Sequence, residues 1–96
     1  MRPSEALARH RDAILEILGR YPVANPRVFG SVARGEDSEE SDLDILVERK
    51  SNLNYFDLAR LEAELKDTIG VQVDIRTEGE FSPRVYGRIS RDFRTL

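Results

Sequence analysis

Cysteine and tryptophan are absent from this chain of 96 residues, and histidine occurs once. Without cysteine there is neither a disulfide framework nor a thiolate metal site, so any metal must bind oxygen ligands or His10. His10 lies among Arg9, Arg11 and Asp12 without a second imidazole or thiolate nearby. This setting favours a surface role for the histidine over a metal-binding one.

Long apolar runs are also missing. No segment approaches the roughly 20 apolar residues of a membrane-spanning helix, and the N-terminus lacks the apolar core of a signal peptide. We therefore expect a cytoplasmic protein without a membrane partner. The formal net charge is −3, which gives no general attraction to nucleic acid, so we do not expect nucleic acid as a direct ligand.

The composition predicts one small globular domain over residues 1–96. Apolar residues make up 40% of the chain and charged residues 34%, with no low-complexity tract. A chain of this length is too short for two independent hydrophobic cores, and folding buries only about 60% of the surface of the unfolded chain. Stability is therefore expected to be modest, and a bound ligand or partner should raise it.

Hydrophobic periodicity predicts an α/β (α+β) fold with a small mixed sheet and helices packed on one face. In the expected strands, apolar residues alternate with polar ones, so each strand has one apolar face for the helices to cover. The terminal apolar stripe either closes the core or contacts another subunit. The expected elements are a helix capped by Ser4 and ending near Leu18, a strand Arg27 to Phe29, a helical turn Val32 to Arg34, a strand Asp42 to Glu48, a helix from Tyr55 to Ile69 capped by Asn54 and ended by Gly70, a strand Val71 to Arg76, and a terminal helix with the stripe Phe81, Val85, Ile89 and Phe93.

Three aspartates fall on the opposite, polar face of this predicted sheet. Asp42 and Asp44 are two apart on one strand, where like charges repel and aspartate is disfavoured. Asp74 lies on the polar face of the next strand and joins the pair if the strands are neighbours. Carboxylates are ligands that suit Mg²⁺. A two-metal phosphoryl-transfer site contains two carboxylates that bridge ions about 3.5–4 Å apart, together with a third acid.

Gly30 and Ser31 supply a candidate phosphate cradle. Glycine lets the backbone approach a ligand closely, and a helix that begins at Ser31 presents free N–H groups, with the serine hydroxyl as a further donor. Arg34 lies one turn later and can add a charged contact. Alone, such a glycine-serine pair is usually a turn and an Asp-x-Asp is usually solvated. Their spacing, strand placement and third acid together favour a metal and nucleotide site.

Other charged segments have simpler interpretations. Glu36, Asp37, Glu39 and Glu40 are expected in a solvated loop without a metal role, and Ser41 is expected to be a turn serine. Arg84, Arg88 and Arg91 share one side of the terminal helix, where a solvated face is favoured over contact with the triphosphate or a partner. The apolar stripe from Tyr55 to Ile69 is most simply part of the core.

The run Phe29 to Gly35, followed by Ser41 to Asp44, resembles the minimal nucleotidyltransferase antitoxins, often called MntA-like, of the DNA polymerase beta-type nucleotidyltransferase superfamily. Ten residues separate Gly30-Ser31 from Asp42-Leu43-Asp44, and this spacing resembles the superfamily signature, with Asp74 as its third acid. The resemblance spans about Arg27 to Arg76. It implies a minimal nucleotidyltransferase fold and a Mg²⁺-dependent transferase of AMP from ATP to a protein (AMPylation).

Carried onto these residues, the resemblance implies nucleotide binding by Gly30, Ser31 and Arg34. It implies that Asp42, Asp44 and Asp74 are catalytic and bind metal, with two Mg²⁺ ions and ATP as substrate. The partner that it implies is a HEPN-domain ribonuclease toxin, inactivated on a tyrosine. Because larger relatives carry a further acceptor-binding domain, we expect the acceptor to be presented from outside.

Two other hypotheses stay open from the residues. The protein can neutralise its toxin by binding alone, using an apolar face that a small domain leaves exposed. Alternatively, the same chemistry can act on RNA or a small molecule, although the acidic balance disfavours RNA and the absence of a second domain disfavours a small acceptor.

Overall fold

A four-stranded mixed sheet organises the chain, and the computed structural model describes all of residues 1–96. The strand order is β3-β2-β1-β4, in which β2 runs parallel to β3 while β1 is antiparallel to both β2 and β4. The elements are α1 Pro3–Gly19, β1 Val23–Phe29, α2 Gly30–Arg34, β2 Leu43–Arg49, α3 Tyr55–Ile69, β3 Val73–Thr77, the 3-10 turn η1 Glu78–Glu80, α4 Pro83–Ile89, the 3-10 turn η2 Ser90–Asp92 and β4 Arg94–Thr95.

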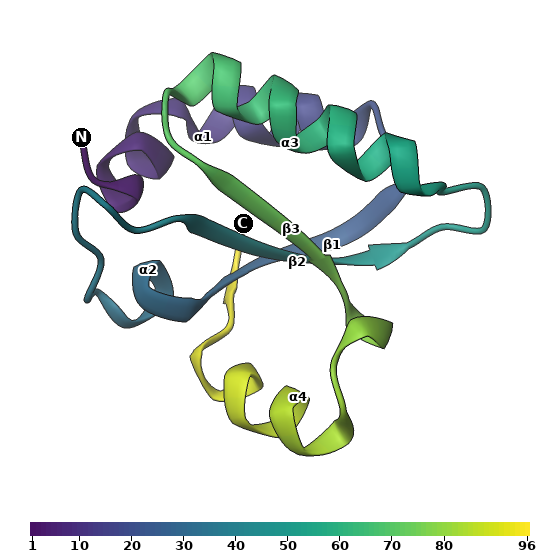
Figure 1. The fold of residues 1–96 in the computed structure, drawn as a ribbon. Helices are drawn as coiled ribbons and strands as arrows, with labels where there is room; N and C mark the ends of the chain where they lie inside the picture. Colours follow the sequence, from purple (N-terminus) through teal and green to yellow (C-terminus); the bar gives the residue numbers. More distant parts are fainter.

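The hydrophobic core lies between the sheet and the pair α1 and α3, which cover one face together (Figure 1). The predicted alternation holds, because every second residue of β2 and β3 enters this core, where it meets the buried side of both helices. The fold class predicted from the sequence is therefore confirmed. The most deeply buried side chains include Ile14, Leu43, Ile45, Val47, Leu61, Leu65 and Val73.

The C-terminal segment covers the other face of the sheet. In Figure 1, α4 lies on the opposite side of the strands from α1 and α3. Phe29 of β1 projects to this side, and its ring centroid lies 6.0 Å from that of Phe81 and 6.4 Å from that of Phe93, both edge-on. Leu46 is fully buried although it alternates with the core residues of β2. This face is therefore partly covered rather than open.

A buried arginine attaches the C-terminal segment to the sheet. Arg27 of β1 is 8% exposed and its Nη2 lies 2.7 Å from Glu78 Oε1. Its Nη1 donates to the Tyr86 hydroxyl at 3.3 Å, and its guanidinium lies 5.0 Å from the centroid of the Phe93 ring. Such a desolvated, multiply bonded charge holds α4 and η2 in one position against β1.

Several predicted boundaries are wrong. Helix α1 begins at Pro3 with Arg2 as its N-cap, so Ser4 lies inside the helix. Strand β1 begins at Val23, and a bulge between Ala24 and Arg27 accommodates Pro26. The terminal helix is shorter than its apolar stripe, because Phe81 and Phe93 lie outside α4, and the two-residue strand β4 was not predicted. Asn54 and Gly70 do bound α3 as expected.

The apolar stripe of α3 is only partly in the core. Leu61, Leu65 and Ile69 are buried, whereas Tyr55 at the first turn is 81% exposed and the neighbouring Phe56 is 72% exposed. The interpretation of Tyr55 as a core residue is therefore wrong. None of the helices combines the length and the apolar character that crossing a bilayer requires.

Candidate active site

Two of the predicted carboxylates face each other on neighbouring strands. Asp44 of β2 and Asp74 of β3 are direct partners in the parallel register, and both are half-buried. Asp42 lies just before the first residue of β2 and is exposed. Because residues two apart on a strand share a face, Asp42 and Asp44 project to the same side of the sheet.

The Asp44 carboxyl group is close enough to Asp74 and Asp42 for their charges to affect it. The pKa of Asp44 is raised to about 6, mainly by burial and next by the negative charges of Asp74 and Asp42, while the charges of Arg76 and Arg34 act in the opposite direction. A carboxyl group whose charge is disfavoured in this way is a typical feature of a site that binds a cation.

Gly30 lies directly against the Asp44 carboxylate. Its φ of +72° is in the left-handed region, and a Cβ atom added to it would lie 2.4 Å from Asp44 Oδ2. Phe29, the residue before it, is the antiparallel partner of Asp44. The predicted glycine-serine turn therefore opens beside Asp44, and any other residue at position 30 would be strained and would displace this carboxylate.

Ser31 and Arg34 belong to the short helix α2 that follows this turn. Ser31 is half-buried, next to Gly30. The guanidinium of Arg34 lies 3.5 Å from Glu36 and 3.8 Å from Asp92, and its charge lowers the pKa of Asp44. Arg34 thus lies between the carboxylates and the C-terminal segment, where it forms part of the wall of a hollow of about 510 Å³ with Arg91 and Arg94.

Arg76 and Glu62 are residues of the site that the sequence interpretation did not single out. Arg76 Nε donates to both carboxylate oxygens of Asp74 at 3.2 and 3.1 Å. The carboxylate of Glu62 in α3 accepts a hydrogen bond from the Ile75 N–H at 2.7 Å. Burial raises the pKa of Glu62, and the negative charge of Asp74 also acts to raise it. Arg76 shares a strand face with Asp74 in the sequence, whereas no local pattern links Glu62 to that strand.

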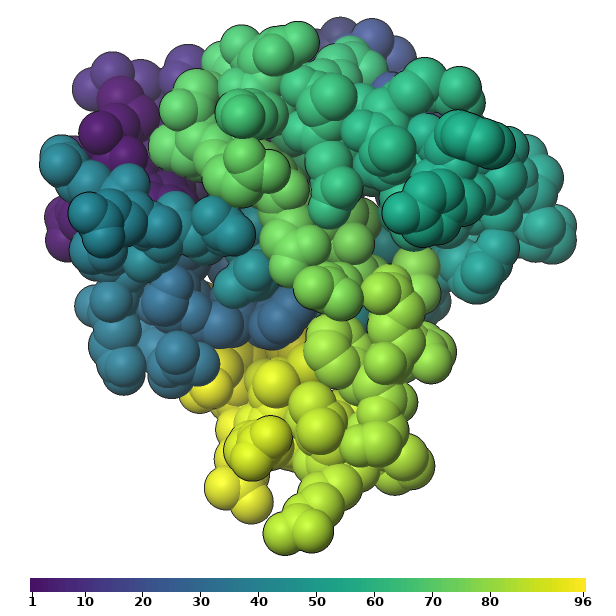
Figure 2. All heavy atoms as spheres, in the orientation of Figure 1, coloured from purple at the N-terminus to yellow at the C-terminus, as the bar shows by residue number.

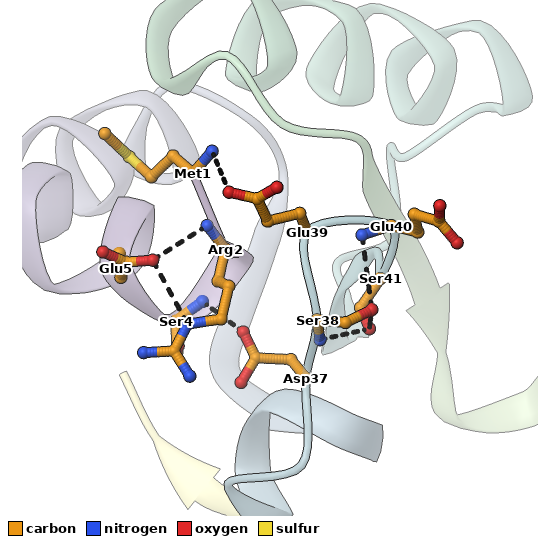
Figure 3. Close-up of polar contacts among 9 residues, drawn as sticks. All are labelled: Met1, Arg2, Ser4, Glu5, Asp37, Ser38, Glu39, Glu40 and Ser41. Atoms are coloured by element: carbon orange, nitrogen blue, oxygen red, sulfur yellow. Dashed lines mark hydrogen bonds and ion pairs between the residues drawn. The ribbon is translucent and has the colours of Figure 1, made fainter.

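The acidic loop before β2 has a structural role (Figure 3). Asp37 is buried, which corrects its assignment as solvated, and its Oδ2 accepts the Ser4 N–H at 2.9 Å. Burial is the largest single influence and acts to raise the pKa of Asp37, but hydrogen bonds from Ser4 and from its own backbone, together with the charge of Arg2, outweigh burial and lower the pKa. The Ser41 hydroxyl accepts the Ser38 N–H at 2.9 Å, as a turn serine does. These contacts fix the path of the chain into Asp42.

The donor set suits a hard divalent cation. No three carboxylate or histidine side chains are arranged so that they can hold one ion together. The Asp74 carboxylate is paired with Arg76, whose Nε lies 3.1 Å from Asp74 Oδ2. Mg²⁺ does not need such a cage, because it usually takes one or two carboxylates and completes its shell with water and substrate phosphates. Asp42 and Asp44, which project to the same side of the sheet, offer two carboxylates of this kind.

Comparison with known proteins agrees with this geometry. The Nucleotidyltransferase domain family matches residues 7–96. The chain is 41% identical over 76 residues to the proposed protein adenylyltransferase MJ0435 of Methanocaldococcus jannaschii, covering 79% of this chain and 82% of the relative.

Solved structures show the same fold. A proposed minimal nucleotidyltransferase superposes with a TM-score of 0.85 at 41% identity, over 97% of this chain and 95% of the other. An MNT antitoxin in complex with a tri-AMPylated HEPN toxin of Shewanella oneidensis superposes with a TM-score of 0.69 at 17% identity, over 92% and 69%. The resemblance inferred from the glycine-serine and aspartate motifs is confirmed. The chain belongs to the nucleotidyltransferase domain family, as one of its minimal nucleotidyltransferases.

Proposed function

We propose that this nucleotidyltransferase moves AMP from ATP onto a tyrosine hydroxyl of a HEPN-type toxin and thereby acts as its antitoxin. The observation that carries the proposal is the register of Asp44 with Asp74, with Gly30 packed against the Asp44 carboxylate. This arrangement puts a glycine turn, where a phosphate can approach the backbone, beside acids that are costly to keep charged without a cation.

In the proposed mechanism the residues of the chain bind and orient the reactants. Asp42 and Asp44, with the help of Asp74, would hold two Mg²⁺ ions, which would supply positive charge against the triphosphate. The backbone at Gly30 and the Ser31 hydroxyl contact the phosphates, and Arg34 adds positive charge. The acceptor oxygen bonds to the α-phosphorus, the bond to the β-phosphate oxygen breaks, and pyrophosphate leaves.

Asp74 is proposed to receive the proton of the acceptor hydroxyl. Its carboxylate is 33% exposed, so an acceptor can approach it, and Arg76 keeps it oriented through two hydrogen bonds. A base held in one orientation within hydrogen-bond reach of the attacking hydroxyl is the requirement for general base catalysis.

The choice of a protein acceptor rests on the relatives. MJ0435 carries the name of a protein adenylyltransferase, and a protein of the same fold is found with an AMPylated HEPN toxin.

The test is transfer from labelled ATP with Mg²⁺ to the candidate HEPN toxin. We expect labelled toxin with the parent protein and none with Asp44→Asn or Asp74→Asn. Glu39→Gln is the matched control, since Glu39 is an acid with 78% exposed side chain in the adjacent loop, and it should label normally. Labelling that survives both aspartate changes would refute the mechanism, and full protection of cells by both variants would favour neutralisation by binding alone.

A further inference from the structure

The three tyrosines of the chain differ in whether their hydroxyl groups are occupied. The Tyr21 hydroxyl donates to Glu64 Oε1 at 2.8 Å. The Tyr86 hydroxyl donates to Glu78 Oε1 at 3.1 Å and accepts from Arg27, and both of these tyrosines are half-buried. Tyr55 is 81% exposed, and its hydroxyl takes no part in the hydrogen bonds that engage the other two. Tyr55 therefore carries the free phenol of this protein.

Tyr55 also borders the same hollow as the proposed base. A hollow of about 180 Å³ between the start of α3 and β3 is lined by Tyr55 together with Asp74, Glu62, Arg76 and Glu80. Tyr55 is the one hydroxyl-bearing side chain among the lining residues. In the space-filling view, the beginning of α3 overhangs a recess beside β3 (Figure 2).

The edge of the sheet restricts what else can fill this hollow. β3 is an edge strand, and an exposed edge usually recruits a partner strand through its free N–H groups. Here Glu62 accepts the Ile75 N–H at 2.7 Å and Glu80 accepts the Thr77 N–H at 2.7 Å. These contacts disfavour the addition of a strand at this edge and leave the hollow open to side chains.

We infer that the protein adenylylates itself on Tyr55. The inference rests on the proposed function, because it uses the same donor and the same base. The Tyr55 oxygen bonds to the α-phosphorus of ATP, and the bond from that phosphorus to the β-phosphate oxygen breaks. Pyrophosphate leaves, and the phenol proton passes to the Asp74 carboxylate and then to solvent. The product is an O-adenylyl tyrosine beside the hollow that Asp74 lines.

The experiment needs only the purified chain, Mg²⁺ and ATP, without any toxin. We expect intact-mass spectrometry to show the addition of one adenylyl group, and peptide mapping to place it on Tyr55. Tyr55→Phe should abolish the addition, while Tyr21→Phe and Tyr86→Phe, which remove the engaged hydroxyls, should retain it. Because Tyr55 is exposed, Tyr55→Phe should unfold at the same temperature as the parent, and this measurement shows that the variant is folded.

Failure of this inference can be separated from failure of the proposed function. If the toxin is labelled while the chain alone gains no mass, self-modification on Tyr55 is wrong and the proposed function stands. If the mass gain persists in Tyr55→Phe, the assignment to Tyr55 is wrong. If the gain is present in the parent and absent in both Tyr55→Phe and Asp44→Asn, the inference is supported.

Discussion

Replacement of Gly30 by alanine tests how closely the glycine turn and the carboxylate depend on each other. The new Cβ would lie 2.4 Å from Asp44 Oδ2, and the residue would have to keep a φ of +72°. The left-handed conformation costs a non-glycine residue about 1–2 kcal/mol. For a domain of this size, each kcal/mol lowers the Tm by roughly 4–8 °C. The contact also forces the Asp44 carboxylate to rotate away from the site.

Gly70→Ala is the matched control for this change. Gly70 ends α3 with a φ of +78°, and a Cβ there meets no atom within 4 Å. It should therefore suffer the same backbone strain without touching an active-site residue. We expect similar falls in Tm for the two variants, but a fall in transfer rate of about 100-fold for Gly30→Ala alone, because a misplacement of about 1 Å has that effect. Equal activities of the two variants would refute the reasoning.

Three further predictions follow from individual charges. The pKa of Asp44 in the folded protein is about 6 against an ordinary 3.8, so protonation of Asp44 stabilises the folded state, and this stability is lost as the pH rises from 3.8 through about 6. Urea titrations of the metal-free protein should show the parent losing stability relative to Asp44→Asn between these two pH values, and parallel curves would contradict this prediction. Asp37→Ala should cost about 1–2 kcal/mol in urea unfolding through loss of the contact with the Ser4 N–H, whereas Glu39→Ala should be nearly neutral. Arg76→Gln removes a cation that competes for Asp74, so half-maximal transfer should need less Mg²⁺, and a higher requirement would show that Arg76 assists metal binding.

The carboxylate pair was predictable because alternation in a strand is a local property. Leu43, Ile45 and Val47 define the buried face of β2, which leaves Asp44 on the other face whatever the rest of the chain does. The register that sets Asp44 beside Asp74 could not be derived from the strands alone. It came from the resemblance, since many registers keep both apolar faces buried.

The errors fall where distant contacts decide the structure. Ser4 is a good N-cap residue, yet its N–H binds Asp37, 33 residues away, and the helix starts earlier. Phe81 and Phe93 continue a helical spacing, but both lie outside α4 and pack edge-on against Phe29 on the same face of the sheet. Tyr55 fits the apolar stripe of α3 but lies beyond the end of the core, so a periodic pattern overstates its burial.

The central claim is that Asp42 and Asp44, beside the Gly30 turn, form the site for a metal-bound nucleotide. It is tested most directly by calorimetric titration of a non-hydrolysable ATP analogue with Mg²⁺ into the parent, the double variant Asp42→Asn/Asp44→Asn and the loop control Glu39→Gln. We expect binding to the parent and the control, and affinity weaker by at least about tenfold for the double variant. Unchanged affinity in the double variant would contradict it.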